Sequence, residues 1–152
     1  MTKTTGEHAV TLREITADTL RPILQLRVAP EQRHFVADNA VSIAQAHFSP
    51  IAWFRAIYAG ETPVGFLMLA DEPEKPCYYL WRLMIGAEQQ GKGYGRQAVL
   101  RLIDHVRTRP GATELLLSYV PGEGCPRDFY RKLGFVETGE LDEGEVVMRL
   151  TL

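Results

Sequence analysis

Cysteine is scarce in this sequence of 152 residues, which contains only Cys77 and Cys125. Two thiols so far apart, with no metal-ligand spacing around them, exclude a disulfide-stapled scaffold and a structural zinc site. We expect each cysteine to pack as a small buried hydrophobic residue in a reduced, cytoplasmic protein that holds no metal.

An excess of charge of one sign and long apolar runs are also missing. The formal net charge of −2 argues against a nucleic-acid partner, because nucleic-acid binding favours a basic surface. No apolar run approaches the roughly 18 residues of a membrane span, and the first ten residues lack a signal-peptide core. We therefore expect no membrane partner. No apolar stripe is left over to fix an oligomeric state, and a homodimer is compatible with the sequence.

Glycine, in contrast, is concentrated at one place, with Gly91, Gly93 and Gly95 at alternate positions. The short apolar run 79–85 before them predicts a buried strand. Apolar residues recur at helical spacing from 98 to 106 and predict a helix after them. A strand, a glycine-rich turn and a helix start together form a cradle for an anion, because backbone N–H groups and the helix dipole both favour negative charge. This stretch therefore predicts a bound phosphate or pyrophosphate.

The glycine spacing distinguishes between kinds of phosphate site. The nucleoside-triphosphatase pattern Gly-x-x-x-x-Gly-Lys-Ser/Thr does not occur. A dinucleotide site needs Gly-x-Gly-x-x-Gly within repeated strand–helix units, which the chain lacks. The remaining pattern is Gln-x-x-Gly-x-Gly at Gln90, Gly93 and Gly95, and it resembles the coenzyme A loop of the GNAT acyltransferases (the N-acetyltransferases related to Gcn5). An ordinary strand-to-helix turn is the alternative.

A second motif strengthens this resemblance. Tyr130 is followed by Gly134 and Phe135, which gives the family's Tyr-x-x-x-Gly-Phe signature after the first motif. The stretches YYLWRLMI, QGKGYGR, LLLSYVP and DEGEVVMRL are similar to those of the bacterial spermine/spermidine acetyltransferase-like proteins. The resemblance covers essentially the whole chain. It implies an acetyltransferase that uses acetyl-CoA (coenzyme A) and acts on a small-molecule amine.

The remaining patterns predict a single α/β (α+β) domain over residues 1–152. With the resemblance, they indicate a mixed, mostly antiparallel sheet that is splayed at the fourth strand, with helices on both faces. We expect Thr16 or Asp18 to cap the first helix, Asn39 to cap the second, and Leu115, Leu116 and Leu117 to be buried on both strand faces. The expected strands are 8–14, 51–58, 63–70, 77–85, 113–120, 135–136 and 146–152. Four helices are expected: the first ends at about Leu26, the second covers 40–48, the third follows the glycines, and the fourth covers 127–133.

The resemblance also implies roles for individual residues. Backbone pairing with the pantetheine arm is implied for strand residues Leu83, Met84 and Ile85. Contact with the cofactor, chiefly its pyrophosphate, is implied for Gln90, Gly91, Lys92, Gly93, Tyr94, Gly95 and Arg96. Glu123 stands where many members have an asparagine that contacts the cofactor, and Ser118 stands where some carry an acidic base. A serine alone cannot act as that base, so the base must lie elsewhere.

The implied reaction is direct acetyl transfer to a primary amine, and it fits the residue types present. The amine must lose a proton, the oxyanion needs a fixed donor such as a backbone N–H, and the leaving thiolate gains from an acid. Tyr130 occupies the family's general-acid position, and its alternative role is that of a packed aromatic. Direct attack needs no protein nucleophile, which agrees with the lack of a Ser-His-Asp or Cys-His pattern.

The acceptor is the least constrained part of the prediction. Asp38 and Glu72 could present carboxylates to a cationic amine, and Trp81 a cation–π face, although loop charges are often only solvated and strand aromatics often only packed. Arg82 could instead position an anionic group. We expect a small primary amine, with a polyamine as one candidate. The alternatives are acetylation of a protein N-terminus or lysine, and a coenzyme A-binding sensor with little catalytic activity.

Overall fold

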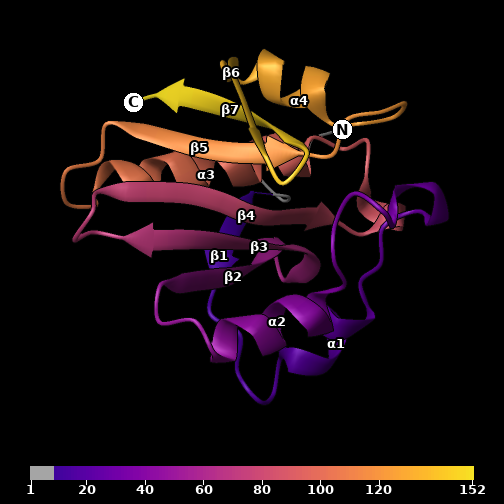
Figure 1. Ribbon diagram of the computed structural model, residues 1–152. Helices are drawn as coiled ribbons and strands as arrows, with labels where there is room; N and C mark the ends of the chain where they lie inside the picture. Colours follow the sequence, from indigo (N-terminus) through magenta and orange to yellow (C-terminus); the bar gives the residue numbers. More distant parts are fainter. Residues whose placement is uncertain (1–8) are drawn as a thin grey trace.

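The computed structural model describes residues 9–152, which form a seven-stranded sheet with helices against it (Figure 1). The strands are β1 (Val10–Arg13), β2 (Ala52–Ala59), β3 (Thr62–Glu72), β4 (Cys77–Ile85), β5 (Glu114–Tyr119), β6 (Val136–Asp142) and β7 (Glu145–Thr151). The helices are α1 (Leu20–Gln25), α2 (Asn39–His47), α3 (Tyr94–Arg107) and α4 (Arg127–Lys132), with 3-10 turns η2 (Pro30–Gln32) and η3 (Ala87–Gln89). Within 9–152, no helix is long and apolar enough to cross a membrane.

The sheet is mostly antiparallel, in the order β1-β2-β3-β4-β5-β7-β6. Only β4 and β5 run parallel, and α3 connects them, because a parallel pair needs a long crossover. The last hairpin folds back so that β7, not β6, pairs with β5. This arrangement confirms the predicted mixed, mostly antiparallel fold.

The sheet opens between β4 and β5, as predicted for the fourth strand. Pairing of these strands is limited to Tyr79 with Leu116 and Leu80 with Leu117. On the other side of β4, the register with β3 passes from Leu80 directly to Arg82, so Trp81 is an extra residue without a partner. A bulge of this kind bends the strand that carries it. The bulge coincides with the point where β4 leaves β5.

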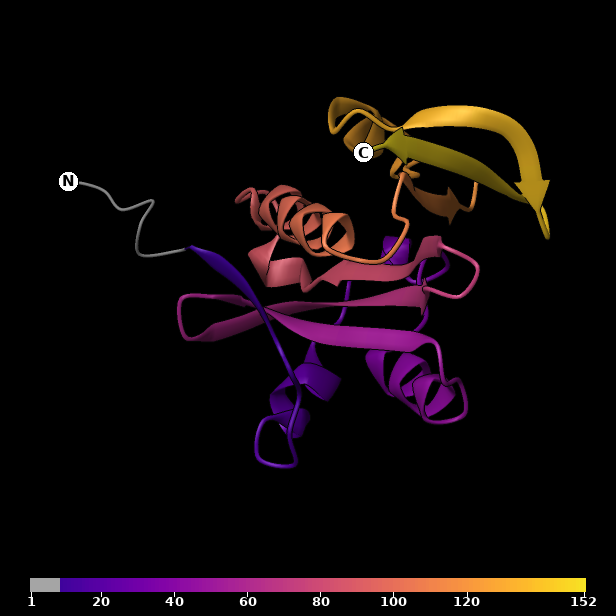
Figure 2. The same ribbon diagram turned by 90° about the vertical axis from the view of Figure 1, so that its left-hand side faces the viewer.

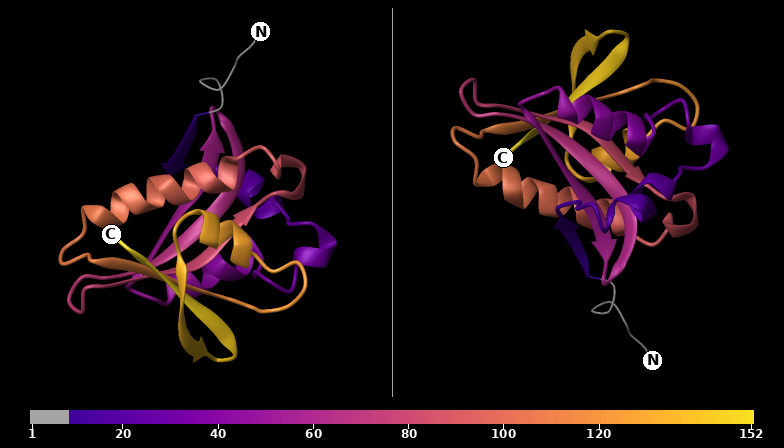
Figure 3. Two further views of the ribbon diagram at one scale, coloured as in Figure 1. Left: turned by 90° about the horizontal axis from the view of Figure 1, so that it is seen from above. Right: turned by 90° about the horizontal axis from the view of Figure 1, so that it is seen from below.

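Two helical layers cover the two faces of the sheet (Figures 2 and 3). Helices α3 and α4 pack on one face, where Val99, Leu102 and Val106 are completely buried. Helices α1 and α2 cover the other face around Ile23 and Phe66. The buried positions of α3 follow the helical spacing read from the sequence, and each fully buried side chain of this size contributes about 1.5–3 kcal/mol. The prediction of helices on both faces is confirmed.

Several local predictions need correction. Asn39 is not the cap of α2 but its first buried residue, and its side-chain amide donates to the Ile23 carbonyl at 2.9 Å, whereas Asp38 is the N-cap. Helix α1 starts after Thr19 rather than after Thr16 or Asp18. Leu116 is only half-buried, because the α1 and α2 layer lies over β2 to β4 and leaves that face of β5 open.

Two further differences concern β6 and the thiols. Strand β6 continues to Asp142, beyond the predicted 135–136, because the tight turn at 143–144 allows a long hairpin. Cys77 and Cys125 are free thiols that are partly exposed rather than buried. Residue 8 of the predicted first strand lies outside the described residues.

Candidate active site

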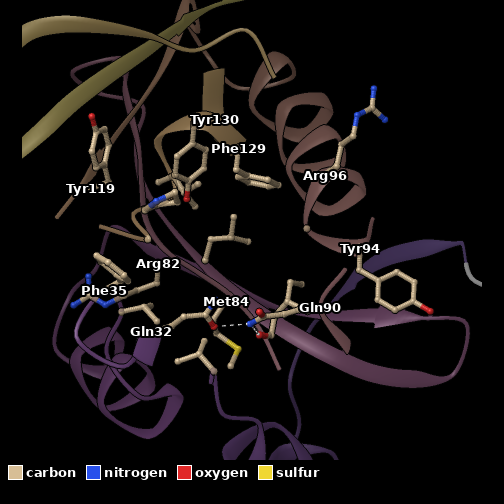
Figure 4. Close-up of a pocket in the computed structure, with 18 of the residues that line it drawn as sticks. Gln32, Phe35, Arg82, Met84, Gln90, Tyr94, Arg96, Tyr119, Phe129 and Tyr130 are labelled. Atoms are coloured by element: carbon tan, nitrogen blue, oxygen red, sulfur yellow. Dashed lines mark hydrogen bonds between the residues drawn. The ribbon is translucent and has the colours of Figure 1, made fainter. Parts of the chain in front are cut away.

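A cavity of about 480 Å³ lies where β4 and β5 diverge, and the start of α3 and the helix α4 close it (Figure 4). It brings together most of the residues that the two sequence motifs identified. The predicted residues that line it are Trp81, Leu83, Met84, Ile85, Gln90, Gly91, Gly93, Tyr94, Gly95, Arg96 and Tyr130. Two motifs that are far apart in the sequence therefore face one space.

The loop before α3 has the geometry of an anion cradle. Gly91 and Gly93 have φ of 79° and 84°, a backbone conformation that glycine adopts without strain. A Cβ atom at either position would meet nothing within 4 Å, so the space beside these amides is open. No side chain caps α3, which leaves its first N–H groups available to an anion.

Gly95 has different surroundings in the same loop. A Cβ there would meet the Phe129 ring of α4 at 3.4 Å, an ordinary van der Waals distance, so this position lies against α4 and not beside open space. The start of α3 and the helix that carries Tyr130 are therefore neighbours at this residue.

The side chains of the loop differ in their relation to the cavity. The Gln90 amide donates to the Ile85 carbonyl at 2.8 Å and to the Gln32 side chain at 2.9 Å, which ties the loop to the end of β4 (Figure 4). The Tyr94 ring and the Arg96 guanidinium group point away from the cavity. Lys92 is exposed, does not line the cavity, and donates to Gln89 at 3.2 Å. The loop offers its backbone, more than its side chains, to a ligand.

The end of β4 forms the opposite wall. Leu83, Met84 and Ile85 pair with β3 along one edge only, because β5 has already diverged on the other. The edge that faces the cavity therefore has no strand partner and can pair with an extended ligand, as an added strand would. The Met84 sulfur lies on the other face of the sheet, 3.6 Å from the Asn39 amide.

Tyr130 lies on α4 with its hydroxyl directed into the cavity (Figure 4). Its ring packs edge-on against Phe129 and Phe135, with centroid separations of 5.2 and 5.7 Å. Burial raises the pKa of the hydroxyl well above its ordinary value, since the phenolate is poorly solvated there. The hydroxyl therefore carries its proton throughout the neutral range and can donate it.

A second cavity, of about 370 Å³, lies on the other side of the splay. It shares Trp81, Arg82 and Ser118 with the first cavity, so the two spaces meet at the point where the strands separate. The rest of its wall is formed by Gln45, Ala46, Ser49, Met68, Tyr79, Asp142, Glu143 and Glu145. The two cavities are therefore neighbours at the bulge.

Three carboxylates line this second cavity from the tip of the β6–β7 hairpin. Asp142 and Glu145 are cross-strand partners on either side of a two-residue turn, whose Glu143 and Gly144 have φ of 50° and 86°. Facing like charges repel each other. Across residues 9–152, no lysine, arginine or histidine forms an ion pair with any of the three. With Arg82 as the cation in its wall, the cavity carries an excess of negative charge.

Hydrogen bonds link these carboxylates to the neighbouring strands. Ser118 donates to Glu145 at 2.8 Å, and Tyr79 donates to Asp142 at 3.3 Å. Burial raises the pKa of Tyr79, a hydrogen bond with Ser118 opposes this in part, and the negative charges of Asp142 and Glu145 raise it further. The net shift is upward, so the hydroxyl stays protonated. Arg82, the cation in this wall, donates to the Gln45 side chain at 2.9 Å.

Some predicted site residues lie elsewhere. Asp38, Glu72, Lys92 and Glu123 line neither cavity. Asp38 is the exposed N-cap of α2, Glu72 pairs with Lys75 at 3.3 Å, and Glu123 is exposed in the loop after β5. The described residues contain no cluster of ligands arranged for a metal ion.

Sequence reasoning missed the three carboxylates of the hairpin. The run Asp142-Glu143-Gly144-Glu145 does give a signal, because an acidic stretch with glycine predicts a hairpin turn. Its position beside β5 depends on the insertion of β7 between β5 and β6, which no local pattern indicates.

Known proteins share both the sequence pattern and the fold. Residues 11–135 match the model of the family described as Acetyltransferase (GNAT) family. The chain is 28% identical over 151 residues to the spermine/spermidine N(1)-acetyltransferase of Bacillus subtilis (strain 168), covering 92% of this chain and 97% of that protein.

Two solved structures have similar folds. An acetyltransferase from Thermus thermophilus superposes with a TM-score of 0.73 at 21% identity, covering 95% of this chain and 99% of the other. The PaiA N-acetyltransferase of Thermoplasma acidophilum, in complex with coenzyme A, superposes with a TM-score of 0.70 at 16% identity, covering 94% and 99%. The predicted fold class is confirmed.

Proposed function

The chain belongs to the acetyltransferase (GNAT) family, and we propose that it transfers the acetyl group of acetyl-CoA to a primary amine of a small polycation such as spermidine. The acyltransferase activity and the acetyl-CoA donor follow from the family. The polyamine acceptor is supported by the acidic second cavity and by the name of the Bacillus subtilis relative.

The first cavity is the proposed site of the donor, which supplies an acetyl group activated as a thioester. The amides of residues 91–96 would hold its pyrophosphate, because Gly91 and Gly93 leave open space beside the start of α3. The unpaired edge of β4 at 83–85 would pair with its amide-containing arm. Gln90 would act by holding the loop against β4 rather than by direct contact.

Tyr130 is the proposed general acid. Its hydroxyl faces the cavity and its buried position keeps it protonated at neutral pH, as proton donation to a leaving thiolate requires. The packing of its ring between Phe129 and Phe135 would fix the direction of the hydroxyl.

The second cavity is the proposed site of the acceptor, and its unpaired carboxylates are the observation that carries the proposal. Its charged wall consists of Asp142, Glu143 and Glu145 against the single cation Arg82. An acceptor with several ammonium groups would relieve the repulsion between these carboxylates and could stack on Trp81. Its terminal nitrogen would reach the donor where the two cavities meet.

Arg82 favours a second candidate acceptor. Its Nε atom is buried without a hydrogen-bond partner among the described residues, and the side chain lines both cavities. An amine that carries a nearby carboxylate, such as a peptide N-terminus or lysine, would offer that nitrogen an acceptor. The excess of carboxylates in the same wall favours the polyamine over this alternative.

A thiol-release assay with acetyl-CoA tests the proposal. We expect turnover of spermidine and spermine to exceed that of aminoglycosides and peptides. In Tyr130→Phe, kcat should fall about 10²-fold or more, the usual contribution of a general acid, with the fold intact because the ring remains packed.

Three results would contradict this assignment. Preference for peptides would favour the protein acceptor, and coenzyme A binding without turnover of any amine would favour a sensor. An unchanged kcat in Tyr130→Phe would remove this residue from the mechanism.

A further inference from the structure

We propose that Ser118 and Glu145 form a proton relay that deprotonates the acceptor amine, an inference that rests on the proposed function. Ser118 Oγ donates to Glu145 Oε1 at 2.8 Å, across the β5–β7 pair. The two residues are 27 positions apart in sequence and meet because Ser118 pairs with Val147, two residues beyond Glu145 on the same face of β7.

The position of Ser118 makes it the link between the two cavities. It follows Leu117, the last residue of β5 that pairs with β4, and it lines both cavities. Glu145 lines only the second cavity. The hydroxyl proton is directed at Glu145, and the Tyr79 hydroxyl is also a hydrogen-bonding neighbour of Ser118. Because the oxygen has two lone pairs, one remains available to an N–H at the junction.

The surrounding groups identify Glu145 as the proton acceptor. On β4, Tyr79 carries a raised pKa and keeps its own proton, and Arg82 is a permanent cation that donates to Gln45 of α2. Neither wall contains a histidine. Of the other carboxylates, Asp142 accepts a hydrogen bond from Tyr79, and Tyr79 does not line the first cavity. Glu143 lies in the turn between Asp142 and Glu145. Of the three carboxylates in this wall, Glu145 is the one that is hydrogen-bonded to a residue shared by both cavities, Ser118.

The proton balance of the reaction is complete with these residues. An alkylammonium gives one proton to Ser118 Oγ while the hydroxyl proton of Ser118 passes to Glu145. The neutral nitrogen then attacks the acetyl carbon, the C–N bond forms, and the C–S bond breaks. Tyr130 gives its proton to the departing sulfur and recovers one from the new amide nitrogen. Glu145 releases its proton to solvent from the second cavity.

The pH dependence of spermidine acetylation in Glu145→Gln and Ser118→Ala tests the relay. Near pH 7, we expect kcat/KM to fall about 10²-fold or more, as for loss of general-base catalysis. As the pH rises, kcat/KM of the variants should increase about tenfold per pH unit, because the fraction of neutral amine increases by the same factor. It should approach the wild-type value near pH 10, where much of the amine is already neutral. Ser118→Thr retains a hydroxyl and should keep the wild-type profile.

Two control variants separate the relay from simple charge loss. Glu143→Gln removes one charge from the same cavity without touching Ser118, so it should raise KM and leave the pH profile unchanged. Glu140→Gln changes an exposed β6 residue that lines neither cavity, so it should change neither KM nor the pH profile.

The possible failures are distinguishable. If kcat/KM of Glu145→Gln is lower than that of wild type by the same factor at every pH, or equals it at every pH, the relay is wrong although the proposed function stands. A wild-type protein that acetylates no amine overturns the proposed function and the relay with it.

Discussion

At the scale of single residues, the three glycines of the loop have two different surroundings. Gly91 and Gly93 have a backbone of positive φ beside open space, and Gly95 lies against the Phe129 ring. Their spacing in the sequence indicated a cradle, but it did not distinguish these surroundings. The distinction can be tested because only the first pair would face the pyrophosphate.

Gly93→Ala should weaken coenzyme A binding as well as the stability of the fold. The loss of affinity should be larger than the loss of stability alone would cause. A left-handed alanine costs about 1–2 kcal/mol, and its methyl group would also occupy the open space beside the amides. Gly139→Ala is a matched control, because Gly139 has φ of 88°, also faces open space, and lies on β6 away from both cavities.

Urea unfolding and calorimetric titration with coenzyme A measure the two effects. Both variants should lose similar unfolding free energy, and only Gly93→Ala should lose affinity, by about tenfold or more. Equal affinities in the two variants would mean that the cradle does not hold the cofactor.

At the scale of elements, α3 joins the glycine loop at its start to a half-buried histidine near its end. The His105 ring stacks on Trp53 of β2, with centroids 4.0 Å apart and an angle of 12° between the rings. Burial lowers the pKa of His105, only partly opposed by the Asp71 carboxylate, and its Nε2 atom is buried without a partner among the described residues. The folded protein therefore favours the neutral ring.

This shift predicts the direction of a pH effect on stability. Because the folded pKa lies below the ordinary 6.5, the contribution of His105 is complete above about pH 6.5 and is lost as the pH falls through the folded value. From pH 7.5 to 5.5, the unfolding free energy should fall more in wild type than in His105→Phe, which keeps an aromatic ring on Trp53.

Urea unfolding at the two pH values measures this difference. His47→Gln removes an exposed histidine at the end of α2 and should behave like wild type. An equal loss of stability in wild type and His105→Phe would show that the stacked ring does not control this pH dependence.

At the scale of the whole molecule, the splay of β4 from β5 creates both cavities and sets their contact. The first cavity, the proposed donor site, offers backbone amides to an anion, and the second cavity, the proposed acceptor site, offers carboxylates to a cation. Opposite electrostatic character on the two sides of one bulge would keep the two substrates in their own cavities.

This arrangement predicts that acceptor binding depends on salt. Between about 0.1 M and 1 M salt, the screening length falls from about 10 Å to 3 Å. The KM for spermidine should therefore rise several-fold, because three partly exposed carboxylates attract its charges. A monoamine with a single charge, assayed in the same series, should change less. An equal change for both acceptors would show that the number of charges is not recognised.

The sequence by itself determined the fold and most of the lining of the first cavity. Period-two and helical patterns, positive-φ glycines and the two motifs are local features, and local backbone preference encodes them. Strand β4, helix α3 and the loop between them occupy the predicted segments, and eleven predicted site residues line the first cavity: Trp81, Leu83, Met84, Ile85, Gln90, Gly91, Gly93, Tyr94, Gly95, Arg96 and Tyr130.

Only the tertiary structure decided the lining of the second cavity. Asp38 and Glu72 were candidates because they are acidic and were expected in loops, but Asp38 is the N-cap of α2, Glu72 ends β3 and pairs with Lys75, and neither lines the cavity. Asp142 and Glu145 reach it because β7 inserts between β5 and β6. That insertion depends on long-range strand pairing, so the contact between Ser118 and Glu145 leaves no periodic signal in the sequence.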